Sequence, residues 1–437
     1  MDKSRFPHAR KPASVLAAAV LLGGALTAAG PGAATAATAR APQAPAPALP
    51  CSAPYQVTST LAGGTTWRMC WRYDSSAGLV LDKVSYQPKG EPRPIQVLTS
   101  AKLAQIHVPY DDGQAEYDDL TGFGFGFGLQ NLKPTECPGG TIKKVKVPDV
   151  GQVDGLCQTT RSRGHAYRLA NDEGTKVWQA EGKDLLLYTV NKVSWYEYIT
   201  EWRFSSDGTI SANVGATGSL SPGDYDAGDG RGWPIGKGAK DYATSHSHNV
   251  FWRLNFGLDG SSKDRIEQYD SKVTPPTGNG SPKTKTTRTP VTKELAGDAK
   301  GMRWWRVVSA IGKNKDGHAR SYEIVPGPSA KHPGRAFTKH DVYFTQNRAC
   351  EQFASNNTLD CGRGAPDSVD KWVNAEMLSN PVVWVNIGFH HIARDEDQQP
   401  MPVHWQGFQL APRDVTAMNP LTPAELASQN GAPPLGS

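Results

Sequence analysis

The sequence predicts an all-β protein, folded as a large β-sandwich. Stretches rich in aromatic and β-branched residues recur along the chain, whereas the 3.6-residue apolar period of amphipathic helices is scarce. One such stretch, residues 193–204, runs into a hairpin turn at residues 205–208 and a second strand at residues 209–211. The chain has 437 residues, of which 38% are hydrophobic, so it can bury the core that two packed sheets require.

The amino-terminal residues 1–36 have the pattern of a secretory signal peptide. Basic residues precede an apolar run at residues 15–28, and small residues follow at residues 34–36. The apolar run is short and interrupted by glycine, and no later stretch approaches the length of a membrane-spanning helix. We therefore expect the mature protein to be secreted and soluble, with no membrane partner.

Three further segments complete the expected domain organisation. Residues 37–52 are rich in Ala and Pro and predict a disordered linker. Residues 53–425 form the predicted folded domain, and residues 426–437 a polar tail. The net charge of +5 is weak and dispersed, which argues against nucleic acid as a partner.

Turn signals divide the expected domain. Residues 67–72 and 79–81 are strand-like and are separated by turn residues at 75–78, which predicts another hairpin. Residues 122–128 alternate Gly with Phe in a spacing that does not fit a dinucleotide-binding loop, so we expect a flexible strand or loop near the site. Residues 274–292 are dense in Pro, Gly, Thr and Lys and predict a long surface loop.

The six cysteines predict disulfide bonds. An even number of cysteines in an exported chain favours disulfides over thiol chemistry or thiolate metal sites. Six cysteines allow fifteen connectivities. Proximity in the sequence suggests Cys51 with Cys70, Cys137 with Cys157, and Cys350 with Cys361.

Histidines at the ends of two apolar strands predict a metal site. His246 and His248 lie on one face of their strand, because side chains alternate between the two faces. His390 and His391 close the strand at residues 382–389 and point to opposite faces, so one of them can supply a third ligand. An all-imidazole site suits copper or zinc. With a nearby carboxylate, the same three histidines would equally suit a zinc hydrolase, and the residues alone leave both interpretations open.

The same alternation orients the aromatic strand. It places Tyr196 and Tyr198 on one face and Trp195 and Glu197 on the other. We therefore expect the side chain of Tyr196 to point away from Trp195.

The order of these motifs resembles the catalytic domain of the copper-containing, topaquinone-dependent amine oxidases, over about residues 67–420. In that family a tyrosine within an Asn-Tyr-Asp/Glu-Tyr strand is oxidised to topaquinone, and the segment Trp-Tyr-Glu-Tyr at residues 195–198 is similar. The resemblance implies that Tyr196 is the precursor of the quinone cofactor.

The resemblance also implies the copper ligands. The family's His-x-His pair matches His246 and His248. Its third ligand is the histidine before an aliphatic residue in a segment similar to residues 383–397, which points to His391 rather than His390.

Further roles follow from the same resemblance. Residues 108–110, Val-Pro-Tyr, resemble the stretch whose tyrosine hydrogen-bonds the quinone oxygen, which implies Tyr110. The family's Tyr-x-Asp resembles Tyr117 with Asp119, which implies a gating aromatic and the catalytic base; Asp118 is the alternative base because the segment is short. Cys137 and Cys157 fall where the family has its disulfide, which supports that pairing.

The implied activity is that of a primary-amine oxidase. A member of the family with a copper ion and topaquinone converts RCH2NH2, O2 and water to an aldehyde, ammonia and hydrogen peroxide, and the family is typically a homodimer. A hydrophobic approach lined by Tyr117, Phe123 and Phe125 would favour aromatic or aliphatic monoamines. Asp119 in an apolar cleft would be a stronger base than a solvated aspartate.

One departure from the family pattern motivates an alternative function. Trp195 stands where the family has the asparagine that precedes the quinone and helps to orient it. The alternative is a catalytically silent homologue that binds copper but forms no quinone and acts as an accessory subunit.

Overall fold

The structure is a computed structural model that describes most of the chain after the expected signal peptide. It describes residues 48–114, 116–222, 225–226, 230–238, 241–357, 361–362, 364 and 367–434, which belong to one compact unit. The predicted signal peptide, residues 1–36, and most of the predicted linker lie outside the described residues. Within the last part of that linker, Cys51 forms a disulfide with Cys70.

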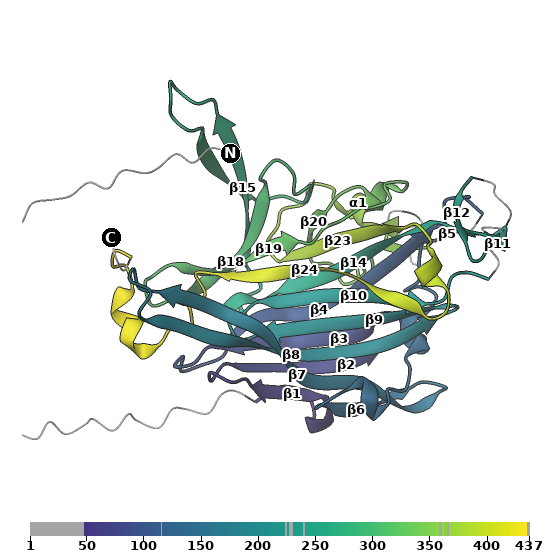
Figure 1. Cartoon of the computed structure of the whole chain (residues 1–437), viewed down its shortest axis with the longest axis horizontal. Coiled ribbons are helices and arrows are strands. Elements are labelled where there is room, and N and C mark those ends of the chain that lie inside the picture. The colour runs from purple at the N-terminus through teal and green to yellow at the C-terminus, as the bar shows by residue number, and fades with distance from the viewer. Residues whose placement is uncertain are drawn as a thin grey trace, which may run out of the picture. The chain divides into compact units, whose positions relative to one another are not determined.

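Two antiparallel sheets make up most of the described structure, as the sequence predicts (Figure 1). The first has nine strands in the described residues, and β14 and β23 lie side by side near its middle. Its strands, in spatial order, are β1 (Gln56–Thr60), β2 (Thr66–Asp74), β3 (Gly78–Gln87), β4 (Ile95–Pro109), β14 (His246–Phe256), β23 (Pro381–His391), β20 (Val342–Gln346) and β17 (Leu295–Gly297), with β5 (Glu116–Tyr117) paired to β4.

The second sheet has ten strands in the described residues, and its middle is formed by the β9–β10 hairpin and its neighbours. Its strands, in spatial order, are β16 (Lys283–Val291), β15 (Arg265–Thr274), β18 (Trp304–Lys313), β19 (Ala319–Pro326), β24 (Met401–Arg413), β10 (Ile210–Gly218), β9 (Tyr196–Ser205), β8 (Val177–Val193), β7 (Gly151–Ala170) and β6 (Thr141–Val147).

Small elements occupy the connections between these strands. Within the described ranges the one α-helix is short, and no helix there is long and apolar enough to cross a membrane. The remaining strands are β11 (Tyr225–Asp226), β12 (Gly232–Ile235), β13 (Asp241–Thr244), β21 (Ser355–Asn356) and β22 (Asp367–Ser368). The helices are α1 (Val369–Trp372) and the 3-10 turns η1 (Ala53–Tyr55), η2 (Phe125–Gly128), η3 (Pro134–Glu136), η4 (Leu258–Gly260), η5 (Ala336–Thr338), η6 (Asp395–Asp397) and η7 (Ala424–Gln429).

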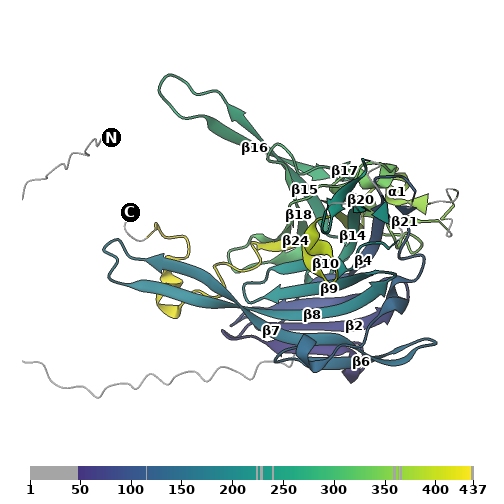
Figure 2. The same cartoon turned by 45° about the vertical axis from the view of Figure 1, so that its right-hand side comes forward.

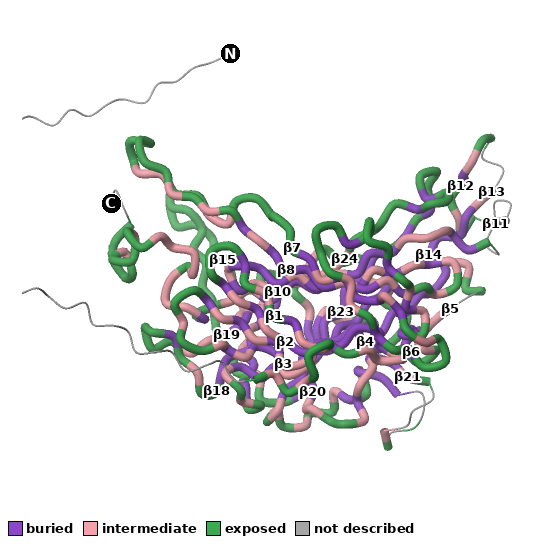
Figure 3. The backbone as a smooth tube through the Cα atoms, turned by 90° about the horizontal axis from the view of Figure 1, so that it is seen from below, coloured by how far each residue is buried: buried purple, intermediate pink, exposed green. Residues whose placement is uncertain are grey.

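The two sheets pack face to face around one large apolar core. Buried stretches gather on the strands in the middle of the described structure, and exposed ones on the turns and hairpin ends (Figure 3). Trp202 of β9 meets Trp252 of β14 edge to face at 5.1 Å between ring centroids, and Trp67 of β2 lies 5.1 Å from Phe204 of β9. Aromatic side chains from both layers therefore interdigitate, as sheet-on-sheet packing requires.

The structure confirms both predicted hairpins. Strand β9 pairs with β10 from Phe204↔Ile210 to Tyr196↔Gly218. Strands β2 and β3 pair across the turn at residues 75–77. In each case the register puts the large apolar side chains on the face that meets the other sheet. A one-residue slip would turn them to solvent, so burial of these side chains favours the observed register.

The predicted long loop at residues 274–292 is wrong. Residues 265–291 form the β15–β16 hairpin, which projects away from the rest of the second sheet (Figures 1 and 2). Alternating Thr and Lys in β16 suit a strand exposed on both faces, because β-branched Thr favours extended backbone. The Gly residues and most of the Pro residues lie in the turn at residues 275–282, whereas Pro290 lies near the end of β16.

The structure pairs the six cysteines as proximity in the sequence suggests. Cys51–Cys70, Cys137–Cys157 and Cys350–Cys361 are bonded, and no cysteine in the described residues is free. Each bridge closes a loop of 11 to 20 residues. Closing such loops restricts the unfolded chain and so stabilises the fold.

Replacing Trp252 with alanine should lower the free energy of unfolding by about 3–5 kcal/mol, because it opens a cavity between the two sheets. Chemical denaturation followed by intrinsic fluorescence and circular dichroism measures this loss. Trp405, whose side chain is 43% exposed, is the matched control and should change stability by less than about 0.5 kcal/mol on the same replacement. Equal losses in the two variants would contradict the packing described here.

Candidate active site

Three buried histidines from two neighbouring strands converge on one point. The register of β14 against β23 places His246 directly opposite His391, and His248 lies on the same face two residues along. One ring nitrogen from each lies within 4.8 Å of the others, close enough to share a metal ion. His390 faces outwards, where its Nε2 lies 2.8 Å from Asp111. The structure therefore confirms that only one of the two adjacent histidines joins the cluster.

Tyr196 approaches this cluster from the opposite sheet. Its hydroxyl lies 2.7 Å from Nε2 of His246 and 2.8 Å from Nδ1 of His391, and its ring centroid lies 5.0 Å from that of His248. The sulfur of Met401, the first residue of β24, is 3.7 Å from the same hydroxyl. The tyrosine oxygen thus sits where the three imidazoles meet, buried between the two layers.

A carboxylate fixes the orientation of His391. Nε2 of His391 donates to the buried Asp397 at 2.9 Å, and the backbone N–H of Arg394 donates to the same oxygen at 3.0 Å. This contact keeps the proton on Nε2 and leaves Nδ1 for the metal. The sequence prediction missed Asp397, although its place six residues after a predicted ligand, within an acidic turn, is a usable signal.

The other two imidazoles also have defined partners. Nδ1 of His246 lies 3.5 Å from the carbonyl oxygen of Thr244, and Nδ1 of His248 lies 3.3 Å from the Tyr198 hydroxyl. Nε2 of His248 is buried and has no hydrogen-bond partner among the described residues. A buried nitrogen without a partner is costly unless something binds it, so its position fits a metal ligand.

Burial keeps the three imidazoles neutral. It lowers the pKa of His246 to about 3 and that of His248 well below its ordinary value, in each case with a neighbouring histidine adding to the effect. Burial also lowers the pKa of His391, and Asp397 opposes this shift. Burial raises the pKa of Tyr196 well above its ordinary value. The cluster therefore offers neutral nitrogens, which are the form that binds metals.

The predicted placement of Trp195 on the strand is wrong. Strand β9 begins at Tyr196, and Ser194 adopts a left-handed conformation with φ 56°, so Trp195 lies in the turn after β8 and not on the strand. Its ring lines the same small cavity as the ring of Tyr196. Strand alternation does not apply across a turn with a left-handed residue, so it does not set the direction of the Trp195 side chain.

Tyr110 and Tyr117 complete this cavity, which has a volume of about 30 Å³. The ring of Tyr110 stacks on His246 at 4.7 Å, and its hydroxyl accepts a hydrogen bond from Nε1 of Trp195 at 3.2 Å. Tyr117 presents its ring edge-on to Tyr110 and Trp195, at 6.4 and 6.3 Å. The two tyrosines assigned by the sequence thus lie beside Tyr196.

Asp119 does not occupy the apolar cleft that was expected. Its carboxylate is buried but accepts hydrogen bonds from Gln105 Nε2 and the backbone N–H of Gly122, both at 2.8 Å, and from the backbone N–H of Asn357 at 3.0 Å. Asp118 accepts from the side chain of Asn357 at 2.6 Å. Neither carboxylate lines the cavity beside Tyr196. In this conformation the hydrogen bond from Gln105 joins the turn that carries Asp119 to strand β4.

The expected approach lined by Phe123 and Phe125 is also wrong. Phe123 is 75% exposed, Phe125 packs in the core 6.0 Å from Tyr198, and neither lines the cavity. The segment forms a turn followed by η2, and a Cβ on Gly126 would lie 2.0 Å from the carbonyl oxygen of Asp74. Glycine is therefore required by close backbone packing there.

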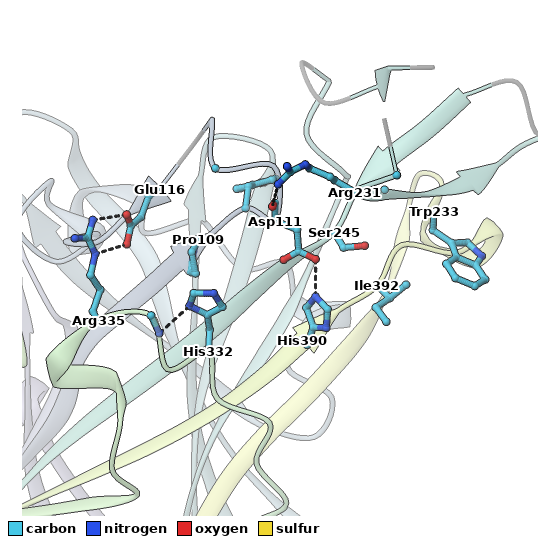
Figure 4. Close-up of a pocket in the computed structure, with 15 residues that line it drawn as sticks. Pro109, Asp111, Glu116, Arg231, Trp233, Ser245, His332, Arg335, His390 and Ile392 are labelled. Carbon is cyan, nitrogen blue, oxygen red and sulfur yellow. Dashed lines mark hydrogen bonds and ion pairs between the residues drawn. The ribbon is translucent and has the colours of Figure 1, made fainter. Parts of the chain in front are cut away.

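A larger groove, seen in Figure 4, includes Tyr110 in its lining. It has a volume of about 770 Å³, and charged pairs lie along it. Asp111 pairs with His390, and Glu116 pairs with Arg335 (Figure 4). Tyr110 lines both spaces, whereas Tyr196 lines only the small cavity.

Comparison with known proteins decides the family. Residues 63–430 match the family model described as copper amine oxidase, enzyme domain. The chain belongs to the copper amine oxidase family. A copper-containing amine oxidase alpha 2 of Arabidopsis thaliana is 26% identical over 422 residues, which cover 85% of this chain and 61% of that protein. A primary amine oxidase of Arthrobacter sp. (strain P1) is 25% identical over 409 residues, with the same coverage of 85% and 61%.

Solved structures of copper amine oxidases share the fold. A copper-containing benzylamine oxidase from Hansenula polymorpha superposes with a TM-score of 0.70 at 21% identity, covering 83% of this chain and 62% of that one. An amine oxidase from Aspergillus nidulans gives a TM-score of 0.69 at 20% identity, covering 82% and 52%. The chain thus spans little more than half to about three-fifths of the length of these relatives.

The histidine cluster of this copper amine oxidase family member fits copper. Three neutral imidazoles, with the soft thioether of Met401 nearby, suit copper far better than calcium or magnesium. His246, His248 and His391 would hold the ion, and Asp397 would support the third ligand.

The copper-free protein should lose stability as the pH falls from about 6.5 towards 3. In this range the unfolded chain binds protons on histidines whose pKa is lowered in the fold, so acid favours unfolding. Each histidine contributes up to about 1.4 kcal/mol per pH unit over the part of the range where it is protonated in the unfolded chain and neutral in the fold. Chemical denaturation across this range, in the presence of a chelator, measures the slope.

The double variant His246→Gln/His248→Gln is the control for this titration. It should show a shallower dependence of unfolding free energy on pH over the same range, because two of the titrating groups are gone. Identical slopes for the two proteins would show that other groups dominate.

Proposed function

We propose that the protein is a secreted copper- and topaquinone-dependent primary-amine oxidase. It would convert RCH2NH2, O2 and water to an aldehyde, ammonia and hydrogen peroxide, acting on aromatic or aliphatic monoamines. The observation that carries the proposal is the Tyr196 hydroxyl, which lies 2.7 and 2.8 Å from ring nitrogens of two candidate copper ligands. A copper ion held by these histidines would lie close to the Tyr196 ring, which O2 would oxidise there.

The chain's own residues prepare this chemistry before any substrate arrives. The quinone, once formed on Tyr196, supplies an electron sink for the amine. His246, His248 and His391 would hold the copper ion. Burial keeps the Tyr196 hydroxyl protonated in the copper-free protein, so deprotonation is coupled to the arrival of the metal.

Access would be controlled by residues that line the small cavity, whereas proton transfer would depend on Asp119, which lies outside that lining. Tyr117 would act as the gate, and the Tyr110 hydroxyl would hydrogen-bond the quinone oxygen. Asp119 would be the base that takes the proton from the substrate carbon. Its carboxylate accepts four hydrogen bonds, three of them at Oδ1 from Gln105, Thr121 and Gly122. Oδ2 accepts one, from the backbone N–H of Asn357, and is therefore the oxygen that would take the proton.

Secretion and dimerisation are part of the proposal. The signal-peptide pattern and three disulfides are typical of exported proteins. Homodimerisation rests on the resemblance to the family. The silent copper-binding homologue is the second candidate, because Trp195 narrows the space beside Tyr196.

Copper and air should convert Tyr196 to the quinone. Protein prepared without copper, then exposed to copper and O2, should yield a Tyr196 peptide whose mass differs from that of unmodified tyrosine and which forms an adduct with hydrazine. Tyr196→Phe should bind copper but give no adduct. An unmodified Tyr196 in copper-loaded wild-type protein would rule out the oxidase and leave the silent homologue.

Replacing Asp119 with asparagine should lower kcat/KM for a primary amine by about 100-fold or more, because a general base contributes roughly 10²–10⁴-fold. Hydrazine labelling of Tyr196 should persist, which separates loss of the base from loss of the cofactor. Asp118→Asn is the matched variant on the neighbouring residue. A larger loss in Asp118→Asn than in Asp119→Asn would assign the base to Asp118.

A further inference from the structure

We propose that Trp195 restricts the substrates to short aliphatic monoamines such as methylamine and ethylamine. This inference rests on the proposed function, since it concerns which amines reach the ring of Tyr196. It narrows the broader expectation of aromatic or aliphatic monoamines, and its basis is the cavity that Trp195 shares with Tyr196.

The size of the cavity limits the size of the amine that can reach Tyr196. Its volume of about 30 Å³ corresponds to about two water molecules. Methylamine has two non-hydrogen atoms and ethylamine three, whereas benzylamine has eight and tyramine ten. A phenyl ring therefore has no room beside Tyr196 unless one of the surrounding aromatic rings moves away.

The lining of the cavity sets the charge preference. Its walls are Val108, Leu120 and Val193 together with the aromatic rings and Ser194, and no ionised side chain is among them. The second ammonium group of a diamine would be buried there without a partner, at a large cost in free energy. The site thus favours monoamines over diamines.

Trp195 is held in place from its backbone as well as its ring. The indole N–H donates to the Tyr110 hydroxyl at 3.2 Å, and the carbonyl oxygen accepts from the backbone N–H of Ser219 at 3.0 Å. Gly218, with φ +109°, lies so close that a Cβ would be 2.4 Å from that carbonyl oxygen. The left-handed Ser194 on the preceding side fixes the turn. Because both its indole ring and its backbone are hydrogen-bonded, Trp195 forms a fixed wall of the cavity.

The groove does not provide a second route for larger amines. Tyr110 separates it from the small cavity, and its ring is fixed by stacking on His246 at 4.7 Å. A benzylamine molecule seated in the groove would meet the charged pairs seen in Figure 4. Tyr196 does not line the groove, so the amine would not lie against the reacting ring.

The test compares amines of graded size on copper-loaded, air-exposed protein. We expect wild-type kcat/KM to be at least about 100-fold lower for benzylamine than for methylamine, as pocket walls discriminate by about tenfold or more per group that does not fit. Trp195→Ala should raise the benzylamine-to-methylamine ratio at least about tenfold. Trp195→Phe keeps aromatic bulk and should stay restrictive, and Trp405→Ala on the outer surface should behave as wild type.

A second readout does not depend on turnover. Methylhydrazine should label Tyr196 in all four proteins, whereas phenylhydrazine should label it rapidly only in Trp195→Ala, as measured by the mass of the Tyr196 peptide over time. Equal labelling of wild-type protein by both reagents, or equal turnover of both amines, would overturn the size limit while leaving the oxidase intact. No adduct with either reagent in any variant would overturn the proposed function, and the substrate restriction with it.

Discussion

The antiparallel pairing of β14 with β23 is the constraint on which the candidate site depends. It sets His246 directly across from His391, while the two-residue repeat brings His248 to the same face. A slip of one residue in that pairing would turn the ligands of one strand away from those of the other. The apolar face that continues along both strands prevents such a slip, because it would expose the core between the two sheets. Packing energy thus sets the geometry of the metal ligands.

Much of this arrangement was predictable from the sequence. Strand alternation placed His246 and His248 on one face, and the adjacency of His390 and His391 required that only one of them point inwards. Rules of this kind succeed inside regular strands, where side-chain direction is fixed by the backbone. Resemblance to the family then supplied Tyr196, whose approach from the opposite sheet is a long-range contact that no local pattern contains.

The failures occurred where the backbone leaves the regular strand. Trp195 was assigned to a strand, but Ser194 turns the chain just before it. Asp119 was expected in an apolar cleft, but the turn that carries it brings Gln105 and Asn357 to its oxygens. Both errors concern contacts made by turns, which depend on tertiary packing and not on the period of the sequence.

The contact between Asp397 and His391 links the metal site to a surface turn. Asp397 ends η6, which is also held by the backbone N–H of Gly236 donating to Asp395 at 2.7 Å. If this turn opens, His391 loses the partner that fixes its ring, and the ion loses an oriented ligand. The residence time of a metal bound there would then depend on how often this short segment opens. The rate at which the ion is lost would then depend on how fast the turn opens, whereas its equilibrium affinity would depend on the three nitrogen ligands.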